Sequence, residues 1–226
     1  MGFTLSSVVP WGRNYEEYLS MFALSATDLK KNIIGIGDGP ASFNSTLTKL
    51  GGNVISVDPI YQFSGKQIKS RIDITYADVM EQMRANKDKY IWKNIQSLED
   101  LGNVRMNAMS DFLADYEADN KKERYIFGDA INLPFANNSF ELALVSHFLF
   151  LYSLHLDKDF HIQSISEALR VANEIRIFPL LTLDSKKSPH VEDVMKHFIG
   201  IGCRAKILDV DYEFQVGGNQ MLVISR

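Results

Sequence analysis

The chain has 226 residues, which is long enough for one sizeable α/β domain and short for two. Its 46% hydrophobic and 23% charged residues are typical of a globular protein and exclude a disordered chain or a fibre. A net charge of −4 argues against nucleic-acid binding through overall charge. The single cysteine, Cys203, excludes a disulfide framework and a cysteine-rich zinc site within one chain.

No apolar run approaches the ~20 residues of a membrane span. The longest run, Leu142–Tyr152, is interrupted by Ser146 and His147. The N-terminus lacks the basic stretch and hydrophobic core of a secretory signal. We therefore expect a cytoplasmic protein with neither a membrane nor a nucleic acid as its partner.

The first sixty residues follow a strand–helix–strand pattern. Residues 14–24 have the spacing of an amphipathic helix, and residues 32–37 form a short apolar strand that ends in glycines. Residues 42–50 predict a helix closed by two glycines, and residues 53–58 predict a second strand that ends in Asp58. Such a βαβ unit builds a parallel sheet.

A helical insertion follows the second strand. Residues 64–122 are polar and charged, with helical patterns over 74–92 and 101–116. A crossover between parallel strands needs only a dozen or so residues, so this segment has room to cover one end of the sheet. The insertion forms either a lid over a site or only an additional outer layer of helices around the sheet. Residues 1–31 are expected to form an N-terminal helical cap.

Alternation resumes after the insertion and completes one domain over residues 1–226. The expected strands and helices are strands at 124–127, 140–145 and 174–181, helices at 159–172 and 190–199, and a terminal hairpin of strands 204–212 and 220–224. About seven strands alternating with helices predict a doubly wound α/β fold.

The glycine turn after the first strand is the main functional signal. Gly35, Gly37 and Gly39 lie between a strand and a helix, where a tight turn lets a ligand approach the backbone. Asp58 ends the next strand and has the chemistry to accept hydrogen bonds from a ribose diol. Together they predict a nucleoside-containing cofactor; the alternative is a tight turn beside a surface acid. The spacing does not fit the G-x-G-x-x-G fingerprint of nicotinamide cofactors.

Three segments in order resemble motifs of the class I S-adenosylmethionine-dependent methyltransferases: residues 35–40, 128–135 and 138–147. The resemblance covers the chain from about Asn32 to the C-terminus apart from the insertion. It implies a Rossmann-like, mostly parallel seven-stranded sheet with an antiparallel strand in the C-terminal hairpin. Segments 59–63, 147–150 and 212–220 look like a little-characterised bacterial group within this family.

The resemblance implies S-adenosyl-L-methionine as cofactor and S-adenosyl-L-homocysteine as product. Carried over position by position, it assigns Gly35, Gly37 and Gly39 to the methionine part, Asp58 to the ribose, Pro59 and Ile60 to the adenine ring, Asp129 and Ala130 to the adenine nitrogens, and Ser146 and His147 to the sulfonium end. The family often has an acid at the position of Gly35 that helps to anchor the amino group of the cofactor. Its absence leaves that role to another group, and Arg13 is a candidate at the carboxylate end.

Methyl transfer mainly requires alignment of acceptor and methyl group, so no fixed catalytic signature is expected. His147 is the candidate base, unless it is only a loop histidine bonded to the backbone. A partly apolar substrate pocket, or alternatively core, is expected from Tyr61, Phe63, Phe148, Phe150 and Tyr152. They favour a small-molecule acceptor. No metal site is expected: His190 and His197 lie seven residues apart on one predicted helix face, but no third ligand lies near them in sequence.

Two other functions are compatible with the sequence. The missing acid at Gly35 allows a non-catalytic cofactor-binding module whose insertion docks a protein partner. An exposed apolar stripe on the helix over 101–116, formed by Met106, Met109, Phe112 or Leu113, and Tyr116, would support this alternative. A nicotinamide-dependent oxidoreductase is disfavoured by the glycine spacing and the terminal hairpin.

Overall fold

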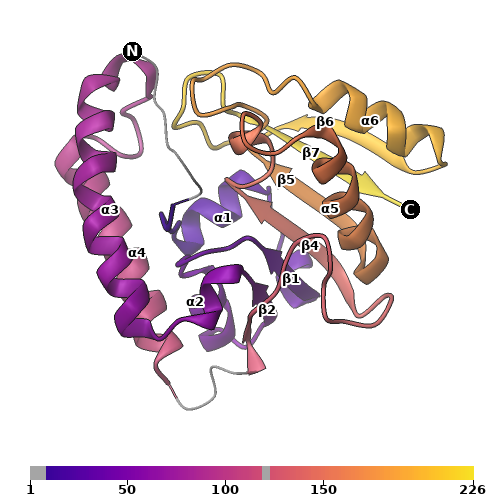
Figure 1. Cartoon of the computed structure of the whole chain (residues 1–226), viewed down its shortest axis with the longest axis horizontal. Helices are drawn as coiled ribbons and strands as arrows, with labels where there is room; N and C mark the ends of the chain where they lie inside the picture. Colours follow the sequence, from indigo (N-terminus) through magenta and orange to yellow (C-terminus); the bar gives the residue numbers. More distant parts are fainter. Residues whose placement is uncertain (1–8, 119–122) are drawn as a thin grey trace.

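The computed structural model describes residues 9–118 and 123–226. They form a seven-stranded sheet of order β3-β2-β1-β4-β5-β7-β6, in which β7 runs antiparallel to both of its neighbours (Figure 1). The strands are β1 (Asn32–Ile36), β2 (Asn53–Val57), β3 (Tyr125–Ile126), β4 (Phe140–Ser146), β5 (Ala172–Phe178), β6 (Arg204–Asp209) and β7 (Gln220–Ser225). The predicted fold, including the terminal hairpin, is confirmed.

Alternating side chains of the central strands build two separate core layers. Ile34 of β1 and Ala143 of β4 face one layer, which α5 (Lys158–Val171) and α6 (Val191–Gly200) cover. Ile33 and Leu142, one residue earlier in each strand, face the layer covered by α1 (Tyr15–Met21) and α2 (Phe43–Lys49). Because both faces of the sheet are buried, these strands are continuous apolar runs. Of the helices in the part of the chain that the structure describes, none is long and apolar enough to cross a membrane.

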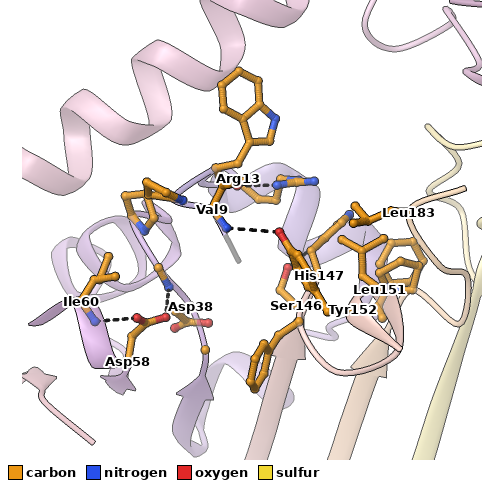
Figure 2. A pocket seen from close by; sticks show the side chains of 18 of the residues that line it. Val9, Arg13, Asp38, Asp58, Ile60, Ser146, His147, Leu151, Tyr152 and Leu183 are labelled. Carbon is orange, nitrogen blue, oxygen red and sulfur yellow. Dashed lines mark hydrogen bonds between the residues drawn. The ribbon is translucent and has the colours of Figure 1, made fainter. Parts of the chain in front are cut away.

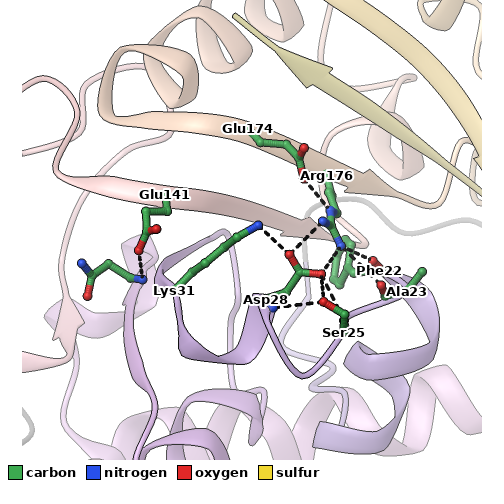
Figure 3. A network of polar contacts seen from close by, with 9 residues as sticks. Phe22, Ala23, Ser25, Asp28, Lys31, Glu141, Glu174 and Arg176 are labelled. Atoms are coloured by element: carbon green, nitrogen blue, oxygen red, sulfur yellow. Dashed lines mark hydrogen bonds and ion pairs between the residues drawn. The ribbon is translucent and has the colours of Figure 1, made fainter.

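A polar network fixes the N-terminal segment to the sheet (Figure 3). Asp28, in the short helix η1 (Asp28–Lys30), accepts hydrogen bonds from Ser25, Lys31 and Arg176. Burial alone would raise the pKa of Asp28, but these donors and the Arg176 charge hold it below its ordinary value. Arg176 lies on β5 and also donates to the Phe22 carbonyl at 2.8 Å. The network thus ties the end of the predicted cap to the middle of the sheet; residues 1–8 of that cap lie outside the described residues.

The insertion folds as two long neighbouring helices, α3 (Gly65–Ala85) and α4 (Leu98–Tyr116) (Figure 1). The predicted helix over 74–92 was wrong at both ends. Helix α3 begins earlier because Ser64 and Gln67 form a capping box, and it ends at Ala85, before the short helix η3 (Lys87–Lys89). The predicted stripe of α4 is buried against Tyr61 and Tyr125 of the same chain.

Buried charges join α1, α4 and the connection that follows β6. Arg105 of α4 is fully buried and donates to both carboxylate oxygens of Glu17, at 2.6 and 2.7 Å. The Tyr212 hydroxyl donates to the same carboxylate at 2.7 Å. Burial alone would raise the pKa of Glu17, but the charge and hydrogen bonds of Arg105 hold it below its ordinary value. Glu17 therefore stays ionised and holds the three segments together.

The Arg105→Met substitution should lower the free energy of unfolding by about 3–5 kcal/mol, because it leaves the Glu17 carboxylate buried without its cation. Urea denaturation measures the loss. The matched control is Lys69→Met, which removes the exposed Lys69–Asp73 ion pair on α3 and should cost less than about 1 kcal/mol. Equal losses in the two variants would contradict the structural role of the buried pair.

Candidate active site

A cavity of about 340 Å³ lies where the parallel strands end (Figure 2). Its walls include the glycine turn after β1, Asp58 after β2 and the last residue of β4, Ser146. The carboxyl ends of β1, β2 and β4 meet at one edge of the sheet, which is where open α/β folds bind ligands. The insertion supplies part of the opposite wall through Val79 and Met83.

The turn after β1 requires glycine at two positions. Gly37 and Gly39 have φ angles of +69° and +55°, in the left-handed region that favours glycine. A Cβ atom on Gly37 would lie 2.8 Å from a ring carbon of Phe148. The Tyr61 hydroxyl donates to the Gly39 carbonyl at 2.8 Å and supports the turn. The predicted conformation of the glycine turn thus has a direct steric cause.

Asp58 is held against this turn. One carboxylate oxygen accepts from the Gly39 amide at 2.9 Å, and the other accepts from the Ile60 amide at 2.8 Å (Figure 2). Each oxygen keeps a second lone pair for a ligand hydroxyl. Burial raises the pKa of Asp58 to about 6, so the carboxylate is mostly ionised at neutral pH.

Asp38 occupies the space that a side chain at Gly35 would need. A Cβ atom on Gly35 would lie 1.8 Å from one carboxylate oxygen of Asp38. That carboxylate accepts from the Tyr18 hydroxyl at 2.8 Å and from the Ser56 hydroxyl at 2.6 Å. Burial raises the pKa of Asp38 to about 6. Asp38 was not among the residues predicted at the site, although an acid inside the glycine triplet was a visible signal.

The other side of the cavity is positive. Arg13 donates through Nη1 to the Trp11 carbonyl, while its Nε is buried without a hydrogen-bond partner among the described residues. Burial and the nearby Arg105 charge lower the pKa of Arg13 to about 10, so it remains a cation. Arg105 is already paired with Glu17, and no carboxylate in residues 9–118 or 123–226 forms an ion pair with Arg13. Arg13 can therefore bind an anionic group of a ligand.

His147 follows β4 in a strained backbone conformation, with φ of +52°. Its amide donates to the Phe178 carbonyl at 2.6 Å, and its Nδ1 lies 3.0 Å from the Ser146 hydroxyl oxygen. Burial and the charges of Arg13 and Arg105 hold the pKa of His147 well below its ordinary value. The ring is therefore neutral at neutral pH and lies in the cavity wall.

Most of the residues expected at the site come together in this cavity. Those that line it are Arg13, Gly37, Gly39, Asp58, Pro59, Ile60, Asp129, Ala130, Ser146, His147, Phe148 and Tyr152. The structure does not bring Gly35, Tyr61, Phe63 or Phe150 into the wall. Gly35 lies within β1, Phe150 is fully buried in the core, and Phe63 is 45% exposed.

Further lining residues come from segments whose approach the sequence pattern did not predict. They are Val79, Met83 and Tyr90 of the insertion, and Leu151, Leu183 and Phe214 of the loops after β4, β5 and β6. Only the folded arrangement of these segments brings them to the cavity.

Comparison with solved structures identifies the class of fold. The mitomycin 7-O-methyltransferase MmcR matches 94% of this chain with a TM-score of 0.51 and 10% identity, and the chain spans 53% of that structure. The magnesium protoporphyrin IX methyltransferase of Synechocystis PCC 6803, solved with bound S-adenosylmethionine, matches 88% of this chain and 72% of its own, with a TM-score of 0.49 and 11% identity. The chain has the fold of the class I S-adenosylmethionine-dependent methyltransferases.

No family model matches the sequence. A search of curated proteins finds the uncharacterized protein MJ0045 of Methanocaldococcus jannaschii, which is 33% identical over 223 residues and covers 98% of both chains. The chain therefore belongs to the same family as this archaeal protein. The bacterial affiliation expected from the sequence finds no support in this relative.

The Asp38→Asn substitution should change how stability depends on pH. A carboxyl whose pKa is raised to about 6 on folding stabilises the folded state when protonated, so its contribution falls as pH rises from 5 to 7. Relative to wild type, Asp38→Asn should gain about 1 kcal/mol in free energy of unfolding across this interval. Urea denaturation at pH 5, 6 and 7 measures the difference; a pH-independent difference would show that the carboxyl does not titrate there.

Proposed function

We propose that the protein is an S-adenosylmethionine-dependent methyltransferase that acts on a small-molecule acceptor. One arrangement carries the proposal. Asp58 accepts a hydrogen bond from the glycine turn on one side of the cavity, and the cation of Arg13, which forms no ion pair among the described residues, lies in the wall of the same cavity. The carboxylate has the chemistry to bind a ribose diol, and the guanidinium has the chemistry to bind the carboxylate of the methionine part.

The fit extends to the amino group of the cofactor. In place of the acid that the family often has at Gly35, Asp38 presents a carboxyl to the cavity wall from three residues further along. We propose that Asp38 supports the ammonium end, either directly or by holding the glycine turn. Pro59, Ile60, Asp129 and Ala130 would bind the adenine ring.

When bound, S-adenosylmethionine would supply an electrophilic methyl group for transfer to a lone pair of the acceptor, with S-adenosylhomocysteine as the leaving group, and a protic acceptor would lose its proton. His147 is a neutral imidazole in the cavity wall and would take that proton, although burial and the charges of Arg13 and Arg105 make it a weak base. Ser146, 3.0 Å from its Nδ1, would fix the orientation of the ring. Val79 and Met83 of the insertion line the cavity and would exclude water from it.

The alternative function, a non-catalytic cofactor-binding module that docks a protein partner, depended on an exposed apolar stripe on α4. In α4, Met109 and Phe112 are fully buried and Tyr116 is 4% exposed, because the stripe packs within the chain. The cavity also extends beyond the glycine turn to an apolar wall, which a pure cofactor-binding module does not need. Both observations favour an enzyme with an acceptor site.

The Asp58→Ala substitution should lower the affinity for S-adenosylhomocysteine at least ~100-fold, because two charge-assisted hydrogen bonds to the ribose are lost. Isothermal titration calorimetry measures the change, and circular dichroism checks that the variant is folded. Asp78→Ala, on the exposed side of α3, is the matched control and should bind like wild type. Unchanged affinity in folded Asp58→Ala would contradict the site assignment, and failure of the wild type to bind would contradict the proposed function.

Affinity for S-adenosylhomocysteine should also depend on pH. Asp58 accepts two hydroxyl groups best when ionised, and its pKa in the free protein is about 6. Binding should therefore weaken about tenfold when the pH falls from 7.5 to 5. Calorimetric titrations across this range test it, with Asp58→Asn as the variant in which the contribution of this group is removed. An equal pH dependence in wild type and Asp58→Asn would assign the effect to another group.

A further inference from the structure

The cavity continues past the cofactor side into an apolar chamber, defined here by Val79, Met83, Tyr90, Leu151, Leu183 and Phe214. Four of them, Val79, Met83, Leu151 and Leu183, belong to one buried hydrophobic cluster, and Tyr90 and Phe214 are partly buried against it. Val79 is 2% exposed and Met83 is 4% exposed. The chamber residues come from α3, the segment after it, and the loops that follow β4, β5 and β6.

Backbone hydrogen bonds fix the walls of the chamber. The Ile91 amide donates to the Phe214 carbonyl at 2.7 Å, and the Val216 amide donates to the Lys89 carbonyl at 2.9 Å. On another side, the Leu183 amide donates to the Leu151 carbonyl at 3.1 Å. These bonds pair segments that are far apart in sequence, so the chamber is a built pocket and not a loose gap between loops.

Aromatic rings give one wall a flat surface. Tyr90 and Phe214 stack with ring centroids 5.0 Å apart, and Trp92 packs edge-on against Phe214. The aliphatic side chains of Val79, Met83 and Leu183 complete the chamber. A thin, planar, mostly apolar molecule gains the most contact in such a space.

None of the charged residues that line the cavity is among the six residues that define the chamber. The lining carboxylates, Asp38, Asp58 and Asp129, belong to the loops that follow β1, β2 and β3. The lining cations are Arg13 and Arg105; Arg105 is paired with Glu17, and the proposed function assigns Arg13 to the cofactor carboxylate. A charged acceptor in the chamber would lose its hydration without gaining a partner of opposite charge.

The Tyr90 hydroxyl and the Gln215 amide are neutral polar groups that can orient a ligand. Burial raises the pKa of Tyr90 to about 12, so its hydroxyl stays protonated. The Gln215 amide nitrogen donates to the Thr182 carbonyl and to the Ser185 hydroxyl, both at 2.9 Å. Its amide oxygen has no partner in the part of the chain that the structure describes, so it can accept a hydrogen bond from a ligand.

We infer that the methyl acceptor is a small, flat, uncharged molecule that lies in this chamber, and not an alkylamine, a phosphorylated compound or a protein side chain. The inference rests on the proposed function, because the cofactor carboxylate is what neutralises Arg13. It deepens that proposal by naming the class of substrate from the distribution of charge and apolar surface.

Three probes with the same ring system and different charges test this inference: 2-naphthol, 2-naphthoic acid and 2-naphthylmethylamine. Each is titrated at pH 7.5 by calorimetry into the full-length protein saturated with S-adenosylhomocysteine. We expect 2-naphthol to bind at least roughly tenfold more tightly than the amine or the acid, because only the neutral probe avoids burying an unpaired charge. Equal or tighter binding of a charged probe overturns the inference, as does no binding of 2-naphthol.

Two variants locate the binding site. Val79→Trp should fill the chamber and abolish 2-naphthol binding, whereas Ile74→Trp, on the same helix at a position that is 59% exposed, should not change it. If Val79→Trp does not fold, Leu183→Phe tests the same site, because it narrows the chamber from the loop after β5. Retained affinity for S-adenosylhomocysteine shows that a variant is folded. Tight 2-naphthol binding in folded Val79→Trp and Leu183→Phe would overturn the assignment.

The outcomes separate the two proposals. If S-adenosylhomocysteine binds and 2-naphthol does not, the acceptor class is wrong and the proposed function stands. If S-adenosylhomocysteine does not bind to the folded wild-type protein, the methyltransferase proposal fails, and the acceptor inference fails with it.

Discussion

Glu17 is a buried carboxylate whose ionised state depends on donors from three separate parts of the chain. Arg105 reaches it from α4 and Tyr212 from the segment after β6, while the Asn14 amide donates from the start of α1. A buried charge of this kind is stable only when its partners are in place. The docking of the insertion, the N-terminal segment and the C-terminal hairpin is therefore coupled through one side chain.

This pairing also determines the electrostatics of the cavity. Because Arg105 forms the ion pair with Glu17, Arg13 lies in the wall as a cation with no ion-pair partner of its own among the described residues. Asp38 and Asp58 place two carboxyl groups at the glycine turn, and burial raises the pKa of each to about 6. The cavity thus separates an acidic side from a basic one. A ligand with both an anionic and a cationic or hydroxyl-rich end complements it, as a nucleoside linked to an amino acid does.

Local patterns were enough to predict the sheet and the cofactor side of the cavity. The apolar runs over 32–37 and 53–58, the glycine triplet and Asp58 are close in sequence, and a parallel βαβ unit places them at one edge without further information. The position of Asp38 was not predictable in this way, because its carboxyl folds back over Gly35 only in the actual conformation of the turn. Phe148 lies in the cavity wall, whereas Phe150, two residues later, lies in the core. The alternation of aromatic and aliphatic residues in this segment could not distinguish the two positions.

The sequence could not predict the apolar chamber, because the chamber forms only where residues 89–91 pair with residues 214–216. More than one hundred residues separate these segments, and neither has a pattern that specifies the other. Their pairing depends on how the insertion docks, and that docking depends on Arg105 and Glu17. The ion pair that stabilises the fold therefore also shapes the chamber, so a change at Glu17 would alter ligand binding at a distance through the position of the chamber walls.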